Sequence, residues 1–448
     1  MDHLRDINSN PPGMEGITLT WIAPDKLRPL GRRARTHSRK QIGQIAESIR
    51  TFGFSVPILV DEQHRIIAGN ARLEAARTLG LEQVPVVVVS HLDPAQKRAF
   101  AIADNRLAEL AGWDRSVLKA ELQELVELDL AFDLDVIGFD DAAIDALVLC
   151  DEEGGSADIV PEAPRIAVTR LGDLWQLDEH RLLCGDALEI TSLEAVLGGD
   201  QARVIFTDAP YNVRVQGHVT KSGHHAEFAM ASGEMGDEEF TQFLRRVWGQ
   251  VSHALVPGGL AYLSMDWRHA KHLLAGYEEH GLELLNVIVW DKVHGGMGSH
   301  YRSRHELIFL VRKPGAQHTN RIELGKHGRD RTNVWAYPGM SGAGHDQKHL
   351  RSLHPTVKPA AMVRDALLDS TGRGDIVLDF FAGSGTILVA AEMARRRARA
   401  IELEPRYCDV AINRWESFTG KEARLSSTGQ TFAEARADRA ITTAAGGI

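Results

Sequence analysis

The sequence contains little cysteine and no long apolar run. Its 448 residues include three cysteines, Cys150, Cys184 and Cys408, which lack the spacing of a disulfide framework or a zinc site. No segment approaches the roughly 18 consecutive apolar residues of a membrane span, and the first residues lack the apolar stretch of a signal peptide. We therefore expect a cytoplasmic protein that has no membrane partner and needs no metal.

Acidic and basic residues are unevenly distributed along the chain. The formal net charge is −10, and residues 104–153 hold 15 acidic side chains against 3 basic ones. Residues 295–364 show the opposite bias, with 12 Lys or Arg against 4 Asp or Glu. A basic stretch suits a polyanionic partner, although a charge run taken alone is more often a solvated surface.

Hydrophobic patterning predicts two α/β regions. Short strand patterns and two helical patterns alternate over residues 17–90, and Gly53 and Gly80 end the helices. From Arg165 onward, buried-strand patterns alternate with helical ones, which predicts a largely parallel, doubly wound sheet. The expected divisions are an N-terminal domain (1–95), an acidic helical segment (96–150), a linker (151–164), a second domain (165–420) and a flexible tail (421–448).

Two short motifs stand at the ends of predicted strands. TDAPYN (207–212) follows the apolar run ARVIF, and DFFAGSGT (379–386) leads from a strand through a Gly-rich turn into a helix. Such a turn lets the backbone approach a ligand, and the helix start presents free N–H groups. Glu402 ends the next strand, where a carboxylate suits ribose hydroxyls. The third glycine of a dinucleotide fingerprint is missing, and a Gly turn alone is structural as often as functional.

Together these motifs resemble those of the S-adenosylmethionine-dependent amino-methyltransferases of DNA, which act on adenine N6 or cytosine N4. The family's cofactor motif reads D-P-F-x-G-S-G-T and its catalytic motif D-P-P-Y. Here the catalytic motif comes first, and HPTVKP (354–359) stands shortly before the cofactor motif, as in the circularly permuted β class. The resemblance spans roughly residues 165–418. It implies a Rossmann-like methyltransferase fold, S-adenosylmethionine as cofactor and double-stranded DNA as substrate.

The resemblance also implies roles for individual residues. Asp208 and the carbonyl of Ala209 would accept hydrogen bonds from the target amino group. Pro210 keeps residue 209 extended, and Tyr211 offers a ring face to the flipped base. Cofactor contacts are expected from Asp186, Thr356, Asp379, Phe381, Gly383, Gly385 and Glu402. Ala209 and Phe380 stand where the family has proline. Because the carbonyl of residue 209 is kept, we expect slower but real catalysis.

Target recognition is expected between the two motifs. The candidates are residues 213–234 and a basic insert at about 294–353, whose arginines suit phosphates or guanine edges. Those arginines are Arg302, Arg304, Arg329, Arg331 and Arg351. The acid at position 208 favours adenine, because cytosine-N4 members of the family more often carry serine there.

Residues 20–92 resemble the ParB-like N-terminal domain. In ParB a G-E-R-R box beside a helix start contacts nucleotide phosphates. Here the box reads G-N-A-R (69–72), so Arg72 is kept while the Glu and one Arg are lost. A nucleotide at this smaller α/β domain therefore remains an open expectation. We expect an accessory module that binds DNA or senses a nucleotide.

Three interpretations remain open at this point. The leading one is a site-specific adenine-N6 DNA methyltransferase of restriction-modification or prophage type. The alternatives are a cytosine-N4 methyltransferase and a ParB-like DNA-binding regulator whose methyltransferase domain has weakened. The intact Asp208, Tyr211 and Glu402 argue against such decay. A homodimer is a further expectation that the sequence leaves open.

Overall fold

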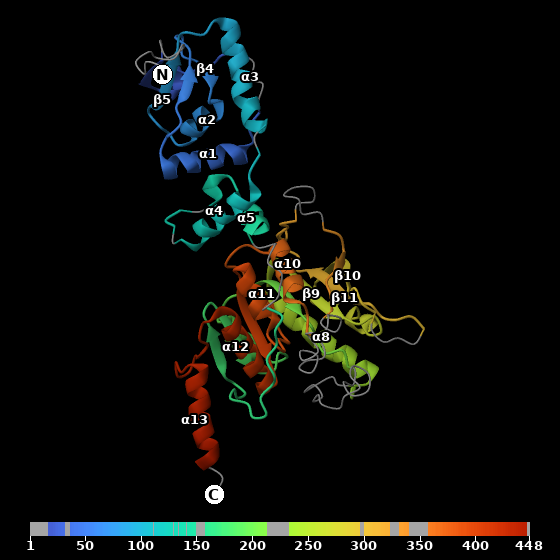
Figure 1. Cartoon of the computed structure of the whole chain (residues 1–448). Coiled ribbons are helices and arrows are strands. Elements are labelled where there is room, and N and C mark those ends of the chain that lie inside the picture. Colours follow the sequence, from blue (N-terminus) through green and yellow to red (C-terminus); the bar gives the residue numbers. More distant parts are fainter. Residues whose placement is uncertain are drawn as a thin grey trace, which may run out of the picture. The chain divides into compact units, whose positions relative to one another are not determined.

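The chain divides into two compact units, Met1–Val148 and Leu149–Ile448. Figure 1 shows the computed structural model, coloured along the sequence. The residues that it describes are 17–31, 36–110, 112–128, 130–132, 134–139, 141–148, 157–212, 233–295, 300–322, 331–339 and 357–445.

The first unit is built on a five-stranded sheet in the order β1-β5-β3-β4-β2. Its strands are β1 (Ile17–Ile22), β2 (Arg28–Pro29), β3 (Ile58–Val60), β4 (Arg65–Ala68) and β5 (Val84–Val89). Its helices include η1 (Pro24–Lys26), α1 (Arg39–Phe52) and α2 (Asn70–Thr78). Ser38 caps α1 by accepting a hydrogen bond from the N–H of Gln41 at 3.1 Å. Gly53, at a φ of +74°, ends it as predicted.

The acidic segment that follows is helical, as the sequence predicts. It contains α3 (Pro94–Leu110), α4 (Arg115–Glu127), η2 (Leu134–Ile137) and α5 (Asp141–Val148). The carboxylate of Asp114 caps α4 by accepting from the N–H groups of Ser116 and Val117. Helices α4 and α5 pack against each other.

The second unit contains a ten-stranded sheet in the order β12-β10-β11-β9-β8-β13-β14-β7-β6-β15. Its strands are β6 (Leu174–Leu177), β7 (His180–Cys184), β8 (Ala202–Thr207), β9 (Leu255–Met265), β10 (Glu283–Asp291), β11 (His305–Arg312), β12 (Val334–Ala336), β13 (Ile376–Asp379), β14 (Arg397–Glu402) and β15 (Arg424–Leu425). The five neighbours from β9 to β7 are parallel, and β11 runs antiparallel to β9. This is the doubly wound, Rossmann-like sheet that the sequence predicts.

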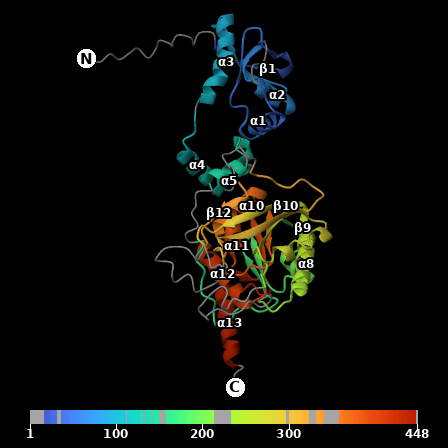
Figure 2. The ribbon, with the colours of Figure 1, turned by 90° about the vertical axis from the view of Figure 1, so that its right-hand side faces the viewer.

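Helices cover the sheet of the second unit in two groups. The first group, α10 (Ala360–Ser370), α11 (Thr386–Ala394) and α12 (Pro405–Thr419), packs together, and α6 (Ile190–Leu197) packs with α8 (Asp237–Ala254). Figure 2 shows α11 and α12 on one side of the strands and α8 on the other. Two short helices, α9 (Ala270–Leu273) and η3 (Glu278–His280), follow β9.

The strand order reverses between β8 and β13, which makes this the switch point of the sheet. β13 is followed outward by β14 and β7, whereas β8 is followed by β9 in the other direction. In such sheets ligands bind beyond the carboxyl ends of the strands, at the place where the order reverses. The catalytic motif follows β8 and the Gly-rich turn follows β13, so both predicted motifs lie at this point.

Three expected segments differ from the structure. The flexible tail expected at 421–448 is wrong for its described part, because β15 joins the sheet and α13 (Phe432–Ala445) follows it, with Phe432 buried against Trp175. The expected linker includes Ala157, which is buried, and Asp158, whose carboxylate accepts from the N–H of Ala360 at 2.8 Å. The expected recognition insert contains β11, which is an internal strand of the sheet.

Candidate active site

The catalytic motif continues directly from the buried strand β8. Ala209 is 1% exposed and belongs to the main hydrophobic core of the second unit, and Tyr211 packs against that core. The Tyr211 hydroxyl donates a hydrogen bond to Oδ1 of Asp208 at 2.6 Å. The motif therefore folds back on itself, and its two polar side chains meet.

A lysine from a distant part of the chain reaches the same carboxylate. Nζ of Lys358 donates to Oδ2 of Asp208 at 2.6 Å and forms an ion pair with Oε2 of Glu306 at 3.0 Å. Glu306 lies in β11, whereas Lys358 precedes α10. The Tyr211 hydroxyl also lies within hydrogen-bonding distance, 3.3 Å, of both groups. These contacts join four ionisable side chains into one cluster, of which Lys358 and Glu306 are buried and Asp208 and Tyr211 are partly buried.

A second lysine and a tryptophan complete this cluster. Nζ of Lys292 is bonded to Oε1 of Glu306. Both lysines lie over the ring of Trp290, Lys292 at 4.9 Å and Lys358 at 5.5 Å from its centroid. Two carboxylates thus face two ammonium groups, and an aromatic face adds a favourable cation–π contact.

Burial and these charges set the protonation of the cluster. Burial raises the pKa of Asp208, Lys358 acts against the rise, and Glu306 adds to it. Burial would also raise the pKa of Glu306, but Lys358 and Lys292 outweigh this and lower it to about 2. The pKa of Tyr211 lies well above its ordinary value because the phenol is buried beside Asp208 and Glu306. The phenol is therefore a stable hydrogen-bond donor at neutral pH.

The Gly-rich turn is tied to the end of β8. The Thr207 hydroxyl donates to Oδ1 of Asp379 at 2.8 Å, and the same oxygen accepts from the N–H of Phe381 at 3.0 Å. Burial raises the pKa of Asp379 to about 7, although both hydrogen bonds oppose the rise. Asp379 therefore changes charge close to neutral pH.

Glu402 supports the same turn from the end of β14. Its Oε2 accepts from the N–H of Gly383 at 2.7 Å, and its Oε1 accepts from the N–H of Glu404 at 2.9 Å. Burial raises the pKa of this carboxyl as well. Each carboxylate oxygen has two acceptor positions, so the side chain can still accept bonds from a ligand.

Gly385 permits a close approach between the turn and α12. Its φ is +77°, and a Cβ there would lie 2.7 Å from Cβ of Ala411 and 3.0 Å from its Cα. A side chain at this position would therefore meet both backbone strain and a steric clash. The side-chain-free backbone of Gly385 and the acceptor carboxylates of Asp379 and Glu402 fit a ligand that carries hydroxyl and ammonium groups.

Of the remaining predicted cofactor residues, Phe381 and Asp186 are described by the structure and Thr356 is not. Phe381 packs against the core near Phe243, and Asp186 follows β7, where its Oδ1 accepts from the N–H of Leu188 at 2.8 Å. Both lie at the carboxyl edge of the sheet with Asp379 and Glu402. Thr356 lies outside the described residues.

Asn212 links the catalytic segment to the chain that precedes α8. It adopts a φ of +55°, a conformation that asparagine tolerates better than most residues. Its amide donates to the carbonyl of Met235 at 2.8 Å and accepts from the N–H of Gly233 at 3.0 Å. Most of the expected recognition loop, 213–232, lies outside the described residues.

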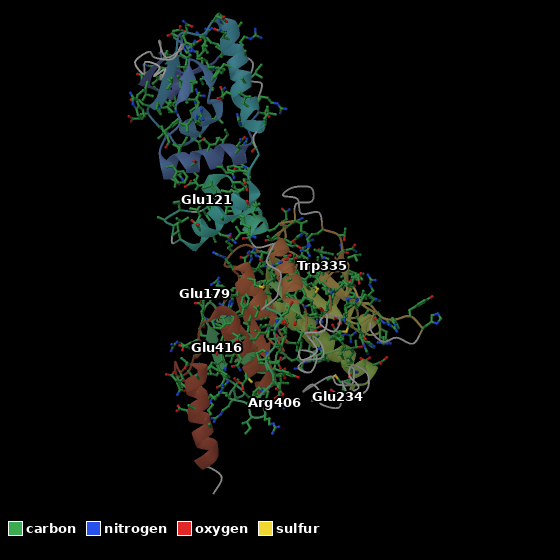
Figure 3. The ribbon with its side chains drawn as sticks, viewed as in Figure 1. Glu121, Glu179, Glu234, Trp335, Arg406 and Glu416 are labelled. Atoms are coloured by element: carbon green, nitrogen blue, oxygen red, sulfur yellow. The ribbon has the colours of Figure 1, made fainter. Side chains whose placement is uncertain are left out.

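The structure separates the arginines that we expected to contact DNA. Arg331 forms ion pairs with Asp369 at 3.2 Å and Asp365 at 3.5 Å, and it lies over the ring of Trp335, which Figure 3 labels. It is therefore engaged within the unit. Arg304 is exposed but donates to Asp291 at 2.6 Å, and Arg302 is exposed. Arg329 and Arg351 lie outside the described residues.

Sequence reasoning missed Lys358, Glu306 and Lys292. Two signals were present: Lys358 belongs to the HPTVKP motif, and Glu306 is an acid directly before five consecutive apolar residues of a strand. Neither signal shows that these residues meet Asp208, because that depends on how distant segments pack.

Two searches of the described residues gave negative results. No group of three or more His, Cys, Asp or Glu in this part of the chain is placed to hold a metal ion. None of the described helices combines the length and the apolar character that crossing a membrane requires.

The fold and its switch point define an α/β domain of the Rossmann-like class. Residues 202–413 match the N6/N4 methyltransferase family model, which is described as DNA methylase. Residues 10–106 match the ParB N-terminal domain, and residues 116–171 match the ParB-methyltransferase HTH domain. We had not foreseen a helix-turn-helix domain in the acidic helical segment.

Curated relatives cover different shares of the chain. The ParB-like nuclease domain-containing protein YnaK of Escherichia coli is 42% identical over 84 residues, which are 19% of this chain and 97% of that protein. The type II methyltransferase M2.DpnII of Streptococcus pneumoniae is 28% identical over 48% of this chain and 82% of its own length. The type II methyltransferase M.HpaI of Haemophilus parainfluenzae is 24% identical over 53% and 75%, respectively.

Solved structures show a weaker similarity. A putative DNA modification methylase from Thermus thermophilus, complexed with S-adenosyl-L-methionine, is 26% identical and aligns with a TM-score of 0.39 over 54% of this chain and 96% of that one. The cytosine-N4-specific PvuII DNA methyltransferase is 16% identical, with a TM-score of 0.41 over 52% and 86%.

Proposed function

We propose that this DNA methyltransferase transfers a methyl group from S-adenosylmethionine to the exocyclic N6 of an adenine flipped out of double-stranded DNA, at specific sites. The observation that carries the proposal is the position of Asp208. Its carboxylate lies at the switch point, beside the Gly-rich turn, where a substrate and a cofactor can meet. The choice of adenine rests on the acid at this position.

The hydrogen bonds of Asp208 leave room for a substrate. Tyr211 occupies one acceptor position on Oδ1 and Lys358 one on Oδ2, so each oxygen keeps a second. An amino hydrogen of the base can bond there, and the carbonyl of Ala209 can accept the other hydrogen. Drawing both hydrogens away favours a tetrahedral nitrogen whose lone pair can attack. Fixed acceptors of this kind need no reorganisation during the reaction.

We propose that Tyr211 holds the flipped base. Nζ of Lys358 lies over its ring, 5.6 Å from the centroid. A base would therefore stack on the opposite ring face, a contact worth about 1–3 kcal/mol in proteins that bind single strands.

S-adenosylmethionine fits the second half of the site. When bound, it supplies an activated sulfonium methyl group. Glu402 would accept bonds from its ribose hydroxyls, while Asp379 and the backbone of Phe381, Gly383 and Gly385 would lie under its methionine part. Asp186 and Thr356 are the further contacts that we propose, near the adenine and the methionine end, respectively.

The experiment that tests this proposal is methyl transfer from labelled S-adenosylmethionine to mixed-sequence DNA, followed by nucleoside analysis. We expect N6-methyladenine. Labelled N4-methylcytosine would support the alternative target base. Tight cofactor and DNA binding without any methyl transfer would support the DNA-binding regulator with a weakened methyltransferase domain.

We also propose a nucleotide as a second ligand, at the ParB-like unit. Gly69 has a φ of +105° and precedes α2, and within the described part of the chain Nε of Arg72 and Oδ1 of Asn70 are buried without a hydrogen-bond partner. Titrating nucleoside triphosphates into the wild type and Arg72→Ala tests this. Equal affinities for both proteins would contradict it.

The homodimer remains a prediction that light scattering can test.

A further inference from the structure

Lys358 is held at Asp208 by several independent contacts. Its Nζ lies 2.6 Å from Asp208 Oδ2, 3.0 Å from Glu306 Oε2 and 3.3 Å from the Tyr211 hydroxyl. An ammonium group has three protons, so each of them has a partner. The side chain is buried, and the ring faces of Tyr211 and Trp290 flank its charge.

The backbone next to Lys358 is also fixed. Pro359 occupies the N-cap position of α10, and Asp158 accepts a bond from the N–H of Ala360, the first residue of that helix. A residue that precedes proline is restricted to extended conformations. The position of the ammonium group is thus set by the fold before any substrate arrives.

Glu306 competes with Asp208 for the charge of Lys358. One of its oxygens faces Lys358, and the other is bonded to Lys292 at the end of β10. The net charge of these two acids and two lysines is zero when all four side chains are ionised. Because Lys358 also interacts with Glu306, its charge lowers the pKa of Asp208 less than it would if Asp208 were its only partner.

We propose that Lys358 and Glu306 are positioning residues that jointly set the charge and orientation of the catalytic carboxylate. Lys358 holds Asp208 ionised and fixes its Oδ2, while Glu306 limits the effect of the ammonium charge. This inference rests on the proposed methyl transfer, in which Asp208 must act as an acceptor. A protonated Asp208 carries a donor hydrogen on one oxygen and cannot accept in the same way.

The other groups around Asp208 support this division of roles. Tyr211 remains protonated and donates to Oδ1, as its raised pKa requires. Asp379, on β13, interacts unfavourably with the charge of Asp208. Burial and both neighbouring acids therefore favour neutral Asp208, and Lys358 is the cation in direct contact that opposes them.

The first test titrates Asp208 directly and needs no activity. Infrared difference spectra between the wild type and Asp208→Asn follow the carboxyl group as a function of pH in the protein without DNA. We expect Lys358→Met to raise the titration midpoint by about one pH unit or more, and Lys358→Arg to restore it largely. The control is Lys313→Met, because Lys313 donates to the carbonyls of Ser252 and Leu255 instead. A midpoint that moves no further in Lys358→Met than in Lys313→Met would overturn the inference.

Glu306→Gln supplies a second test with the opposite sign, which remains readable even if Lys358→Met does not fold. Removing this carboxylate leaves more of the lysine charge to Asp208, so its midpoint should fall. The acidic limb of the pH profile of methyl transfer, measured at saturating cofactor and DNA, should move the same way in each variant. An unchanged or raised midpoint in Glu306→Gln contradicts the inference.

The two proposals fail in different ways. If the infrared midpoints of the Lys358 and Glu306 variants shift as expected but the wild type transfers no methyl group at any pH, the proposed function alone is contradicted. Methyl transfer that loses rate equally at all pH values in Lys358→Met, with an unmoved titration, would leave the function intact and overturn the role of Lys358.

Discussion

The Thr207 hydroxyl donates a hydrogen bond to Oδ1 of Asp379 at 2.8 Å, across 172 positions of the sequence. Thr207 ends β8 and Asp379 ends β13, which are neighbouring parallel strands. The contact joins the catalytic segment to the Gly-rich turn at the switch point of the sheet. Any ligand that the turn holds is therefore close to the carboxylate that follows Thr207.

The raised pKa of Asp379 predicts that cofactor binding depends on pH. Burial raises its pKa to about 7, so the carboxyl is mostly neutral below pH 7 and ionised above it. A cationic ligand favours the ionised form, and binding then releases a proton below pH 7. Affinity for S-adenosylmethionine should therefore rise with pH and level off above 7. We expect binding at pH 8 to be about tenfold tighter than at pH 6, as measured by calorimetry.

Asp379→Asn is the control for this dependence. The amide oxygen can still accept the bonds from Thr207 and Phe381, but the side chain no longer titrates. Its affinity should vary little between pH 6 and pH 8. If the variant keeps the full pH dependence of the wild type, another group is responsible.

Gly385→Ala should destabilise the turn. The new methyl group would lie 2.7 Å from Cβ of Ala411, at a φ of +77°. We expect a loss of about 1–3 kcal/mol in the free energy of unfolding and weaker cofactor binding. Gly374→Ala serves as a control that introduces backbone strain without a steric clash. Its φ is +71°, but no atom lies within 4 Å of its Cβ position. Equal losses in both variants would show that the contact with Ala411 does not matter.

Much of the fold and half of the site could be predicted from the sequence because the signals are local. Gly53 marks a helix end through its own backbone freedom, and the run ARVIF predicts the buried strand β8 because four of its five residues are apolar. The residues from Asp208 to Tyr211 are neighbours in the chain, so their meeting follows from the motif itself.

The rest depends on contacts between distant segments. Lys358 reaches Asp208 across 150 positions, and Glu306 reaches Tyr211 across 95, so no local pattern reports either contact. The segment that we expected to be a flexible tail has few large apolar residues. Its helix α13 is nevertheless anchored, because Phe432 packs edge-to-face on Trp175 at 5.4 Å.

Ala209→Pro should increase the rate of methyl transfer. Pro210 already restricts residue 209 to extended geometry, and proline would also fix its φ while keeping the carbonyl. We expect an increase of about two- to fivefold, because an acceptor carbonyl that is held in one orientation before the base arrives needs less reorganisation during the reaction. Residue 209 is 1% exposed, so the thermal unfolding temperature must be measured alongside the single-turnover rate. A correctly folded variant that is no faster than the wild type would contradict the prediction.

Arg302 and Arg331 should behave differently when replaced by alanine. Arg302 is exposed, so its loss should weaken DNA binding. The slope of the logarithm of the DNA-binding constant against the logarithm of the salt concentration should fall in magnitude by about one. Arg331 is paired with Asp365 and Asp369, so its loss should mainly lower the unfolding temperature. DNA affinity measured over a range of salt concentrations, together with thermal unfolding, distinguishes the two. The reverse pattern would mean that Arg331 faces the DNA.

The most direct test of the account is the single-turnover rate of methyl transfer to DNA in Asp208→Asn, measured at saturating S-adenosylmethionine. Asp200→Asn is the control, because Asp200 is half-exposed and its nearest cation lies 3.9 Å away, on Arg399. The account predicts a loss of at least about 100-fold for Asp208→Asn, with cofactor affinity kept, and little change for Asp200→Asn. Methyl transfer at the wild-type rate in Asp208→Asn would contradict it.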